Sequence, residues 1–294
     1  MNAGTWILLA LLAALTLWYI VRWYLLERAR SRVGTGSPDA IDLATGCVTN
    51  FFDTLGIGSF APTTAIFKFR GRVPDENIPG TLNAGHALPT IAQALIFIAA
   101  VQVEMWTLIG MIAAAVLGAW LGVGVVARLP RRAIQIGMGC ALLFAALLFL
   151  AKNLDWMPGG GDATGLDGAR LVFAVAMSFL LGALMMLGVG LYAPCLILVS
   201  LLGMNPLAAF PIMMGSCAFL MPVGGARFVR SGRYDRRAAL GLALGGVPGV
   251  LVAAYVVKSL PIEWIRWLVL VVVVYAAVQM LLSARRVRVV TGST

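Results

Sequence analysis

The octapeptide LGIGSFAP at Leu55–Pro62 returns 132 residues later as LGVGLYAP at Leu187–Pro194. Five of the eight positions are identical, and both copies keep the spacing Gly-x-Gly-x-x-x-Pro. Each copy lies in the middle of a long apolar stretch, the first in Asp42–Phe67 and the second in Leu171–Leu202. Because Pro removes a helical hydrogen bond and Gly adopts backbone conformations that other residues avoid, each stretch is predicted to be a helix broken near its middle.

The duplication extends well beyond the octapeptide. Pro79 and Pro211 share the offset of 132, and an offset of 131 relates three further pairs: Gly118 with Gly249, Leu129-Pro130 with Leu260-Pro261, and Ile134 with Ile265. The chain is therefore predicted to contain two homologous halves. The expected division is an N-terminal anchor helix and linker (1–41), a first repeat (42–151), an extracytoplasmic loop (152–170), a second repeat (171–283) and a cytoplasmic tail (284–294).

The composition indicates a membrane protein. Of the 294 residues, 61% are hydrophobic and only 12% are charged, whereas soluble domains carry about 25% charged residues. This excludes a soluble enzyme, a disordered chain and a secreted disulfide scaffold. Apolar runs of about 20 residues can cross a bilayer, and besides the two interrupted stretches the sequence has seven: Trp6–Leu26, Thr81–Ala100, Met105–Ala127, Ala133–Ala151, Pro206–Arg227, Ala238–Val257 and Ile262–Ser283.

The basic residues choose between two topologies. If every apolar stretch crosses the membrane, the halves are parallel, and 14 of the 22 Lys and Arg residues lie inside. If the broken stretch of each half is re-entrant, the halves are inverted, and 18 lie inside. Because Lys and Arg are enriched in cytoplasmic loops, we expect an all-α polytopic membrane protein of two inverted repeats. Each repeat has one re-entrant broken-helix hairpin plus three transmembrane helices, and one N-terminal transmembrane helix precedes them. The net charge of +10 then reflects topology and not nucleic-acid binding.

The duplicated Gly and Pro motifs, with Leu-Pro before the last helix of each half, resemble those of the TauE/SafE sulfite-exporter family. The resemblance covers about residues 42–283 and is closer in the second half. It implies transport of a small sulfur-containing or organic anion across a bacterial inner membrane. The distribution of basic residues separately predicts an extracytoplasmic N-terminus and a cytoplasmic C-terminus. The triple glycine common in that family is replaced here by Gly58-Ser59-Phe60 and Gly190-Leu191-Tyr192. The N-terminal helix and the loop 152–170 are interpreted as additions to the family pattern.

The broken helices predict an anion site. Helix N-termini carry unpaired N–H groups and the positive end of the helix dipole, so breaks at membrane depth attract anions. The candidate substrate-binding residues are Gly58, Ser59, Pro62, Thr63, Asn83, His86, Gly190, Tyr192, Pro194, Cys195, Ser216 and Cys217. Each also has a simple structural interpretation, as packing or as an internal hydrogen bond. His86, the single histidine, either binds an anion or relays a proton, or is neutral and bonded to a backbone carbonyl.

Asp53 is the one carboxylate well inside an apolar segment, and its repeat equivalent is Met185. An acid at membrane depth is costly and so points to function, which makes Asp53 a candidate for carrying a coupling proton or for positioning a cation. Two structural roles stay open: an ion pair with an Arg between residues 227 and 237, or a cap on a half-helix.

No cofactor and no metal are expected. The four cysteines lack metal-ligand spacing, and the sequence contains neither a Walker phosphate loop nor a Ser–His–acid set. We therefore expect no enzyme but a secondary transporter, whose partners are a small anion, the lipid bilayer and a possible second copy in a homodimer. Two alternatives stay open: a membrane enzyme that uses Cys195 or Cys217 on a lipid or a sulfur compound, and a passive anion channel.

Overall fold

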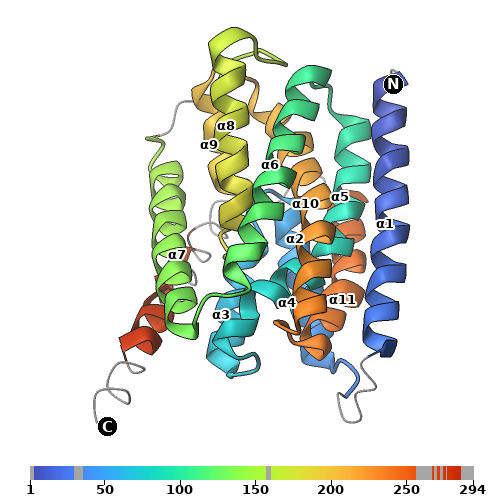
Figure 1. Cartoon of the computed structure of the whole chain (residues 1–294). Helices are drawn as coiled ribbons and strands as arrows, with labels where there is room; N and C mark the ends of the chain where they lie inside the picture. Colours follow the sequence, from blue (N-terminus) through green and yellow to red (C-terminus); the bar gives the residue numbers. More distant parts are fainter. Residues whose placement is uncertain are drawn as a thin grey trace.

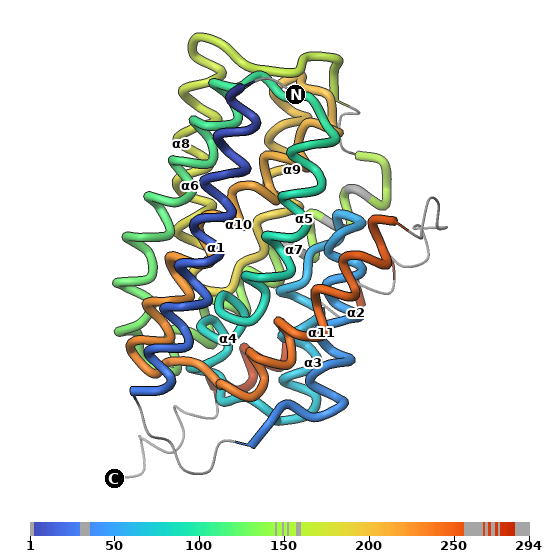
Figure 2. Tube along the Cα trace, turned by 90° about the vertical axis from the view of Figure 1, so that its right-hand side faces the viewer, coloured from blue at the N-terminus to red at the C-terminus, as the bar shows by residue number. Residues whose placement is uncertain are grey.

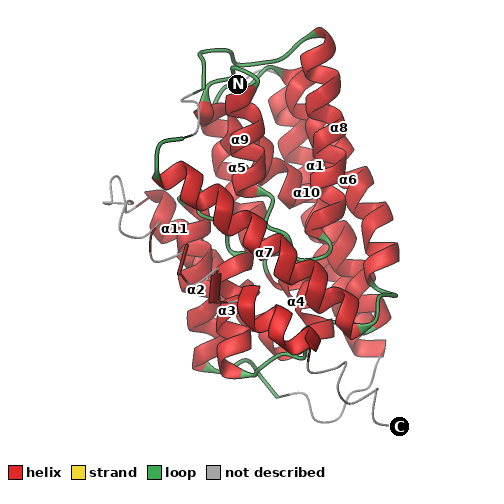
Figure 3. Cartoon of the chain, turned by 90° about the vertical axis from the view of Figure 1, so that its left-hand side faces the viewer, coloured by secondary structure: helices red, strands yellow, loops and turns green. Residues whose placement is uncertain are grey.

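A computed structural model describes residues 3–29, 36–156 and 160–255, together with 267, 270, 271, 274, 275 and 277–285. These residues form α-helices, two short 3₁₀ helices and loops, as Figure 3 shows, with a single isolated bridge between Ala163 and Met204. The elements are α1 (Ala3–Ala29), α2 (Ala40–Thr54), α3 (Phe60–Arg70), η1 (Asp75–Asn77), α4 (Ile78–Gly85), α5 (Ala87–Ala100), α6 (Met105–Val126), α7 (Arg131–Asn153), α8 (Gly168–Met185), α9 (Tyr192–Leu201), η2 (Pro206–Ala208), α10 (Ala209–Ser231) and α11 (Arg236–Tyr255).

Among the described residues, seven helices are long and apolar enough to cross a membrane: Ala3–Ala29, Asp75–Ala100, Met105–Val126, Arg131–Leu148, Gly168–Met185, Pro206–Ser231 and Arg236–Tyr255. The prediction of an all-helical membrane protein with several spans is confirmed. Most of the predicted span Ile262–Ser283, and with it the repeat positions Leu260, Pro261 and Ile265, lies outside the described residues.

The two halves exchange partners. The broken helix of the first half, α2, packs along α11 of the second, while α8 packs along α6. At both contacts a glycine faces a backbone carbonyl so closely that a Cβ atom would overlap it: Gly249 meets Cys47, and Gly118 meets Phe179. Cys47 and Phe179 are repeat equivalents, as are the two glycines. The duplicated glycines therefore serve the same close helix contact twice, with the roles of the halves reversed.

The ends of the bundle are held by different sets of contacts. At the lower end in Figure 1, Lys68 pairs with Asp75 at 2.7 Å, and Arg233 donates to the carbonyls of Ala127 and Leu129. At the upper end, the Glu104 N–H donates to the Thr164 carbonyl at 2.9 Å. The lower end, which we call the basic end, carries most of the described arginines, in the α3–η1, α6–α7 and α10–α11 connections.

Helix α1 belongs to the bundle. It contacts α5 and α10, beside which it runs in Figure 2. The Tyr19 hydroxyl donates to the Ala84 carbonyl at 3.0 Å, and the Trp23 indole N–H donates to the Tyr234 hydroxyl at 3.2 Å. Tyr19 and Trp23 are buried, whereas Trp6, Trp18 and Tyr24 on the outer face are exposed.

Candidate functional site

The two helix breaks begin with the same pair of backbone hydrogen bonds. Gly56 donates to the Asp53 carbonyl and Ile57 to the Phe52 carbonyl; 132 residues later, Gly188 donates to Met185 and Val189 to Leu184. This pair of bonds is a Schellman motif, which requires a left-handed residue just after the helix and usually places glycine there. Gly56 and Gly188 fill that position with φ of +85° and +98°. The octapeptide thus ends one helix and turns the chain toward the next.

Each broken helix doubles back, so that both of its arms reach the same end of the bundle. In the first half, Arg72 after α3 pairs with Asp39 at 2.7 Å and Asp42 at 2.9 Å, at the start of α2. We call the end where the two arms of a broken helix meet its mouth. In the second half, backbone hydrogen bonds close the mouth: the Gly161 N–H donates to the Met204 carbonyl at 3.0 Å and the Asn205 N–H to the Ala163 carbonyl at 2.8 Å. The first mouth lies at the basic end and the second at the opposite end (Figure 1).

The two turns meet at a small enclosed cavity. Its volume of about 20 Å³ has room for about one water molecule. Its walls are Asp53, Gly58, Ser59, Phe60, Thr90, Met185, Gly190, Leu191, Tyr192, Cys217 and Met221. A Cβ on Gly58 would lie 4.0 Å from the Cβ of Tyr192, and a Cβ on Gly190 would lie 4.0 Å from that of Phe60. Because 58 and 190, and also 60 and 192, are repeat equivalents, the halves meet here by a reciprocal contact.

The N-termini of two helices border this cavity. The N-cap residues Ser59 and Leu191 make no side-chain hydrogen bond to the helices they precede, α3 and α9. The first turn of an α-helix leaves its N–H groups without intrahelical partners. Pro62 and Pro194, at the third position of each helix, lack an N–H and so reduce this number. The amides of Phe60 and Ala61, and of Tyr192 and Ala193, remain at the two ends.

A buried hydrogen-bond network joins Asp53 to three other elements. The Gln93 amide of α5 donates to Asp53 Oδ2 at 2.9 Å and to Thr54 Oγ1 at 3.0 Å. The Tyr192 hydroxyl of α9 donates to Gln93 Oε1 at 2.6 Å, and Ser59 lies within hydrogen-bonding reach of the Asp53 carboxyl. Asp53 is 2% exposed. Its partners are thus neutral groups at the cavity, whereas Arg237 at the basic end pairs with Asp42.

His86 lies at the junction of α4 and α5 and is fully buried. Its Nδ1 is 3.1 Å from Asn50 Oδ1, and its Nε2 is 3.0 Å from Thr63 Oγ1. The Asn50 amide nitrogen donates to the Gly46 carbonyl, so the amide oxygen of Asn50 accepts a hydrogen bond from the Nδ1–H group of His86. A neutral ring then accepts the Thr63 hydroxyl at Nε2. The hydrogen-bond partners of His86 are side chains, not the backbone carbonyl of the simplest structural interpretation.

The structure brings about half of the candidate residues to the cavity. Those that line it are Asp53, Gly58, Ser59, Gly190, Tyr192 and Cys217. Asn83 reaches its wall by donating to the Met185 carbonyl at 3.3 Å, and the Asn83 Oδ1 atom is buried with no hydrogen-bond partner among the described residues. Thr63 and His86 form their own pair nearby. Pro62, Pro194, Cys195 and Ser216 are not among the wall residues.

Sequence reasoning missed several residues of the site. On α5, Thr90 lines the cavity and Gln93, one turn later, donates a hydrogen bond to the Asp53 carboxylate. Asn50 is hydrogen-bonded to His86. Each is a polar residue in an apolar segment, which is the signal that singled out Asp53. Cys217 also lines the cavity, and its thiol lies 3.5 Å from the Met185 sulfur.

These features define a polytopic helical membrane protein whose two broken helices meet at a small central cavity. The family model described as sulfite exporter TauE/SafE matches residues 2–149 and 170–293, and the chain belongs to this family. No curated protein and no solved structure matches it. Because the match begins at residue 2, α1 is part of the family pattern, and its interpretation as an addition is wrong. Most of the loop 152–170 lies in the unmatched gap.

Proposed function

We propose that the chain is a secondary transporter, and an exporter in the sense of its family description, of a small sulfur-containing or organic anion such as sulfite, thiosulfate or a sulfonate. One observation carries the proposal: two duplicated helix breaks, from opposite halves, form the walls of a single buried cavity. Broken helices that meet inside a bundle built from inverted repeats are characteristic of secondary transporters.

We further propose that the halves are inverted repeats and that α2–α3 and α8–α9 are re-entrant hairpins. The support is geometric. The first hairpin closes at the basic end through Arg72, and the second closes at the other end through the pairing of residues 161–163 with 204–205. The exchanged glycine contacts and the reciprocal approach of Gly58 to Tyr192 and of Gly190 to Phe60 are what a pseudo-twofold axis through the cavity would produce.

The basic end is proposed to face the cytoplasm of a bacterial inner membrane. Lys and Arg are enriched in cytoplasmic loops, and the arginines of the three connections at this end outnumber the lone Arg170 described at the other. Helix α1 begins at the opposite end, so the N-terminus would be extracytoplasmic (Figure 1). The last described residues end near the basic end, where Ser283 accepts a bond from Lys68 at 3.0 Å.

The cavity of about 20 Å³ is too small for any of these anions, so we assign the conformation to a closed state. Transport then requires each hairpin in turn to separate from its neighbours and open the cavity to one side. The amide N–H groups that begin α3 and α9 would bind the anion, with the Ser59 and Tyr192 hydroxyls as further donors. A closed cavity also favours alternating access over a continuously open channel.

Asp53 provides a basis for proton coupling. An ionised carboxylate and an anion about 4 Å apart repel each other by roughly 4 kcal/mol at an effective dielectric constant of 20. Asp53 lines the cavity that the anion would enter, so the anion is expected to bind when the Asp53 carboxyl group is protonated. In that state the carboxyl O–H becomes a further donor, while Gln93 continues to hold the carboxyl in place. Anion and proton would then travel together.

Flux measurements in proteoliposomes test the transport proposal. The wild-type chain should show saturable flux of sulfite, thiosulfate or methanesulfonate. Gly190→Leu should block it, because the backbone there accepts a side chain while the added atoms fill the cavity. Gly36→Leu, at a position with open surroundings, is the matched control. Absence of saturable flux for all three anions in correctly folded protein would refute the proposal, and activity retained by Gly190→Leu would move the site elsewhere.

A variant without Cys195 and Cys217, here called Cys-free although Cys47 and Cys140 remain, separates transport from catalysis. If Cys195 and Cys217 serve packing, their replacement by Ala should leave flux within about threefold of wild type, since buried free cysteines behave as small apolar residues. A substrate adduct on Cys217, seen by mass spectrometry and lost together with activity in the Cys-free chain, would favour the enzyme instead.

A further inference from the structure

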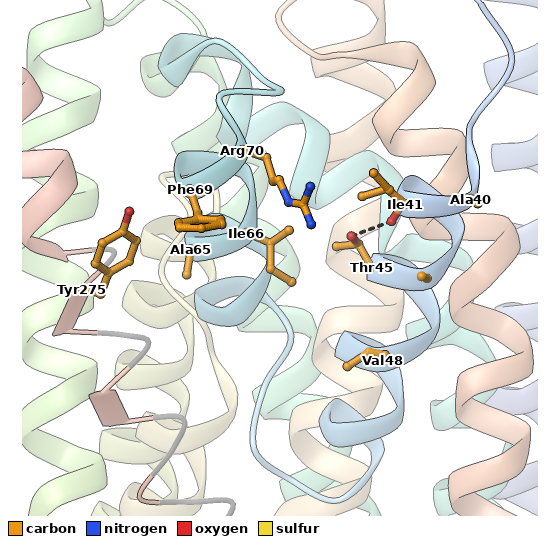
Figure 4. A pocket seen from close by; sticks show the side chains of 10 residues that line it. Ala40, Ile41, Thr45, Val48, Ala65, Ile66, Phe69, Arg70 and Tyr275 are labelled. Atoms are coloured by element: carbon orange, nitrogen blue, oxygen red, sulfur yellow. Dashed lines mark hydrogen bonds between the residues drawn. The ribbon is translucent and has the colours of Figure 1, made fainter.

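A groove separates the two arms of the first hairpin on the outside of the bundle. It has a volume of about 720 Å³, within the range of pockets that hold organic molecules. Its walls, shown in Figure 4, are nearly all apolar: Ala40, Ile41, Ala44, Thr45 and Val48 of α2, Ala65, Ile66, Phe69 and Arg70 of α3, and Tyr275. Val48 is 50% exposed and Phe69 is 72% exposed. We call this the hairpin groove; it opens onto the outer, apolar surface of the bundle.

A second, polar pocket adjoins the groove at the basic end. It has a volume of about 280 Å³ and is lined by Asp42, Arg70, Gly71, Arg72, Asp235, Arg237 and Ala238. Arg70 belongs to both pockets. In Figure 4 its guanidinium extends from α3 across the gap toward Ile41 on α2, above the apolar walls. The shape is therefore that of an amphiphile: a long apolar volume with a charged pocket at one end.

The polar pocket leaves the guanidinium of Arg70 without a direct hydrogen-bond or ion-pair partner among the described residues. Arg72 and Arg237 share Asp39 and Asp42, at distances between 2.6 and 2.9 Å. The Asp235 carboxylate accepts the Ala238 N–H at the start of α11. Among the described residues, no hydrogen bond or ion pair engages Arg70. This arginine is thus free to bind one negative charge brought by a ligand.

We propose that an anionic phospholipid occupies this site, with an acyl chain in the hairpin groove and its phosphate at Arg70. A free inorganic anion would not account for the apolar groove, and an uncharged lipid would not account for Arg70. The free energy of an acyl chain is similar in the bilayer and in the apolar groove. The headgroup therefore decides which lipid is preferred. One surface cation is expected to favour an anionic over a zwitterionic lipid about fivefold.

The position of the groove gives the lipid a mechanical role. Its walls are the two arms whose connecting turn, at Gly56 and Gly58, borders the central cavity. A chain between α2 and α3 acts as a wedge that keeps the arms apart. This proposal depends on membrane insertion alone, so it would survive a different identification of the transported anion.

Native mass spectrometry of the full-length protein tests the site. The protein is released from nanodiscs that contain equal amounts of dioleoyl-phosphatidylglycerol and dioleoyl-phosphatidylcholine. The wild-type chain should retain one lipid with about fivefold preference for phosphatidylglycerol. Arg70→Gln should retain a lipid but lose the preference for phosphatidylglycerol. Ala44→Phe, which fills the groove from an exposed position on α2, should retain no lipid.

Two matched variants keep the result specific. Arg128→Gln removes an exposed arginine at the same end but outside both pockets, and Ala99→Phe adds the same bulk at an exposed position on α5. Both should behave as wild type, and size-exclusion profiles should show that all four variants fold. Equal loss of preference in Arg128→Gln would assign the effect to the general charge of the basic end and overturn the proposal. So would a lipid signal that Ala44→Phe leaves unchanged, or a chain dimer that Ala44→Phe abolishes.

Discussion

The two helix breaks share one helix-ending motif but are surrounded by different side chains. At equivalent positions the first half has Asp53, Asn50 and Gln93, where the second half has Met185, Gly182 and Gly225. The polar residues of the first half form a hydrogen-bond network. The glycines of the second half allow close contact instead: Gly182 faces the Ala115 carbonyl and Gly225 faces that of Asn83. The two halves therefore form a symmetric frame, while most of the polar side chains of the site come from the first half.

The strongest test of this asymmetry compares Asp53→Asn with Met185→Leu. The repulsion of roughly 4 kcal/mol between an ionised Asp53 and the anion corresponds to about a thousandfold in binding. In the wild type, flux should rise as the pH falls and the carboxyl gains its proton, and decline as the pH rises. Asp53→Asn should make flux nearly independent of pH and unable to follow a proton gradient, whereas Met185→Leu should keep both properties.

The measurement is anion uptake into proteoliposomes at fixed anion gradient and varied pH. A pH dependence that persists unchanged in folded Asp53→Asn would remove Asp53 from the coupling mechanism. It would leave the anion site itself untouched.

The second test removes the hydrogen-bonded side chain of His86, whose equivalent in the second half is Ala218. His86→Ala leaves Asn50 Oδ1 and Thr63 Oγ1 buried without their partner and opens a cavity, so we expect a loss of roughly 2–4 kcal/mol of stability. Ala218→Ser adds a hydroxyl in the apolar half and should cost less. Because the neutral ring is already bonded at both nitrogens, the pH profile of flux should keep its shape in His86→Ala. Thermal unfolding in detergent and the flux profile provide the two readouts; a flattened profile would instead make His86 a proton carrier.

The third test concerns Gly58 and Gly190, which are equivalent in sequence but not in backbone. Gly58 has φ of +93°, whereas Gly190 has no positive φ. A side chain in the left-handed region costs about 1–2 kcal/mol, so Gly58→Ala should destabilise the protein by that amount. Gly190→Ala has its nearest neighbour at 4.0 Å and should change stability by less than about 0.5 kcal/mol. Equal losses in thermal unfolding would show that the two turns share one conformation after all.

The sequence was sufficient for the frame because the frame is local and duplicated. A left-handed glycine after each helix, a proline in the first turn of the next and the apolar runs between them are short-range signals, and their repetition separated them from chance. The different φ values of Gly58 and Gly190 could not be predicted from the sequence, because the packing of the surrounding helices determines them.

The site was less predictable because its contacts join distant segments. Asp53 stood out as a charge in an apolar run, but its partner Gln93 is 40 residues away, and only the packing of α5 against the first break brings them together. The motif predicts Pro62 and Pro194 as binding residues. In the structure they lie inside α3 and α9, where they reduce the number of free amides, and they are not among the residues that line the cavity.

The smallest expected effect distinguishes the two hairpin mouths. The first is held by Asp39, Asp42, Arg72 and Arg237, and the second by backbone bonds between residues 161–163 and 204–205. The backbone N–H of Asp42 and the Arg72 guanidinium hold the pKa of Asp39 below its ordinary value of 3.8, and the same carboxylate raises the pKa of Arg72. A lowered carboxyl pKa means that the stability contributed by this contact is complete above pH 3.8 and is lost as the pH falls toward the lowered pKa of the folded protein.

Spin labels at Ala40 and Phe69 report the first mouth, and labels at Asp162 and Leu207 report the second. At neutral pH both pairs should give narrow distance distributions. Asp39→Asn at pH 7, acidification down to the lowered pKa of Asp39, or high salt should broaden the first distribution alone, because screening and protonation weaken ion pairs and leave backbone hydrogen bonds intact. If the second mouth broadened equally, the two mouths would be opening as one unit. Their different chemistry would then have no bearing on how each hairpin moves.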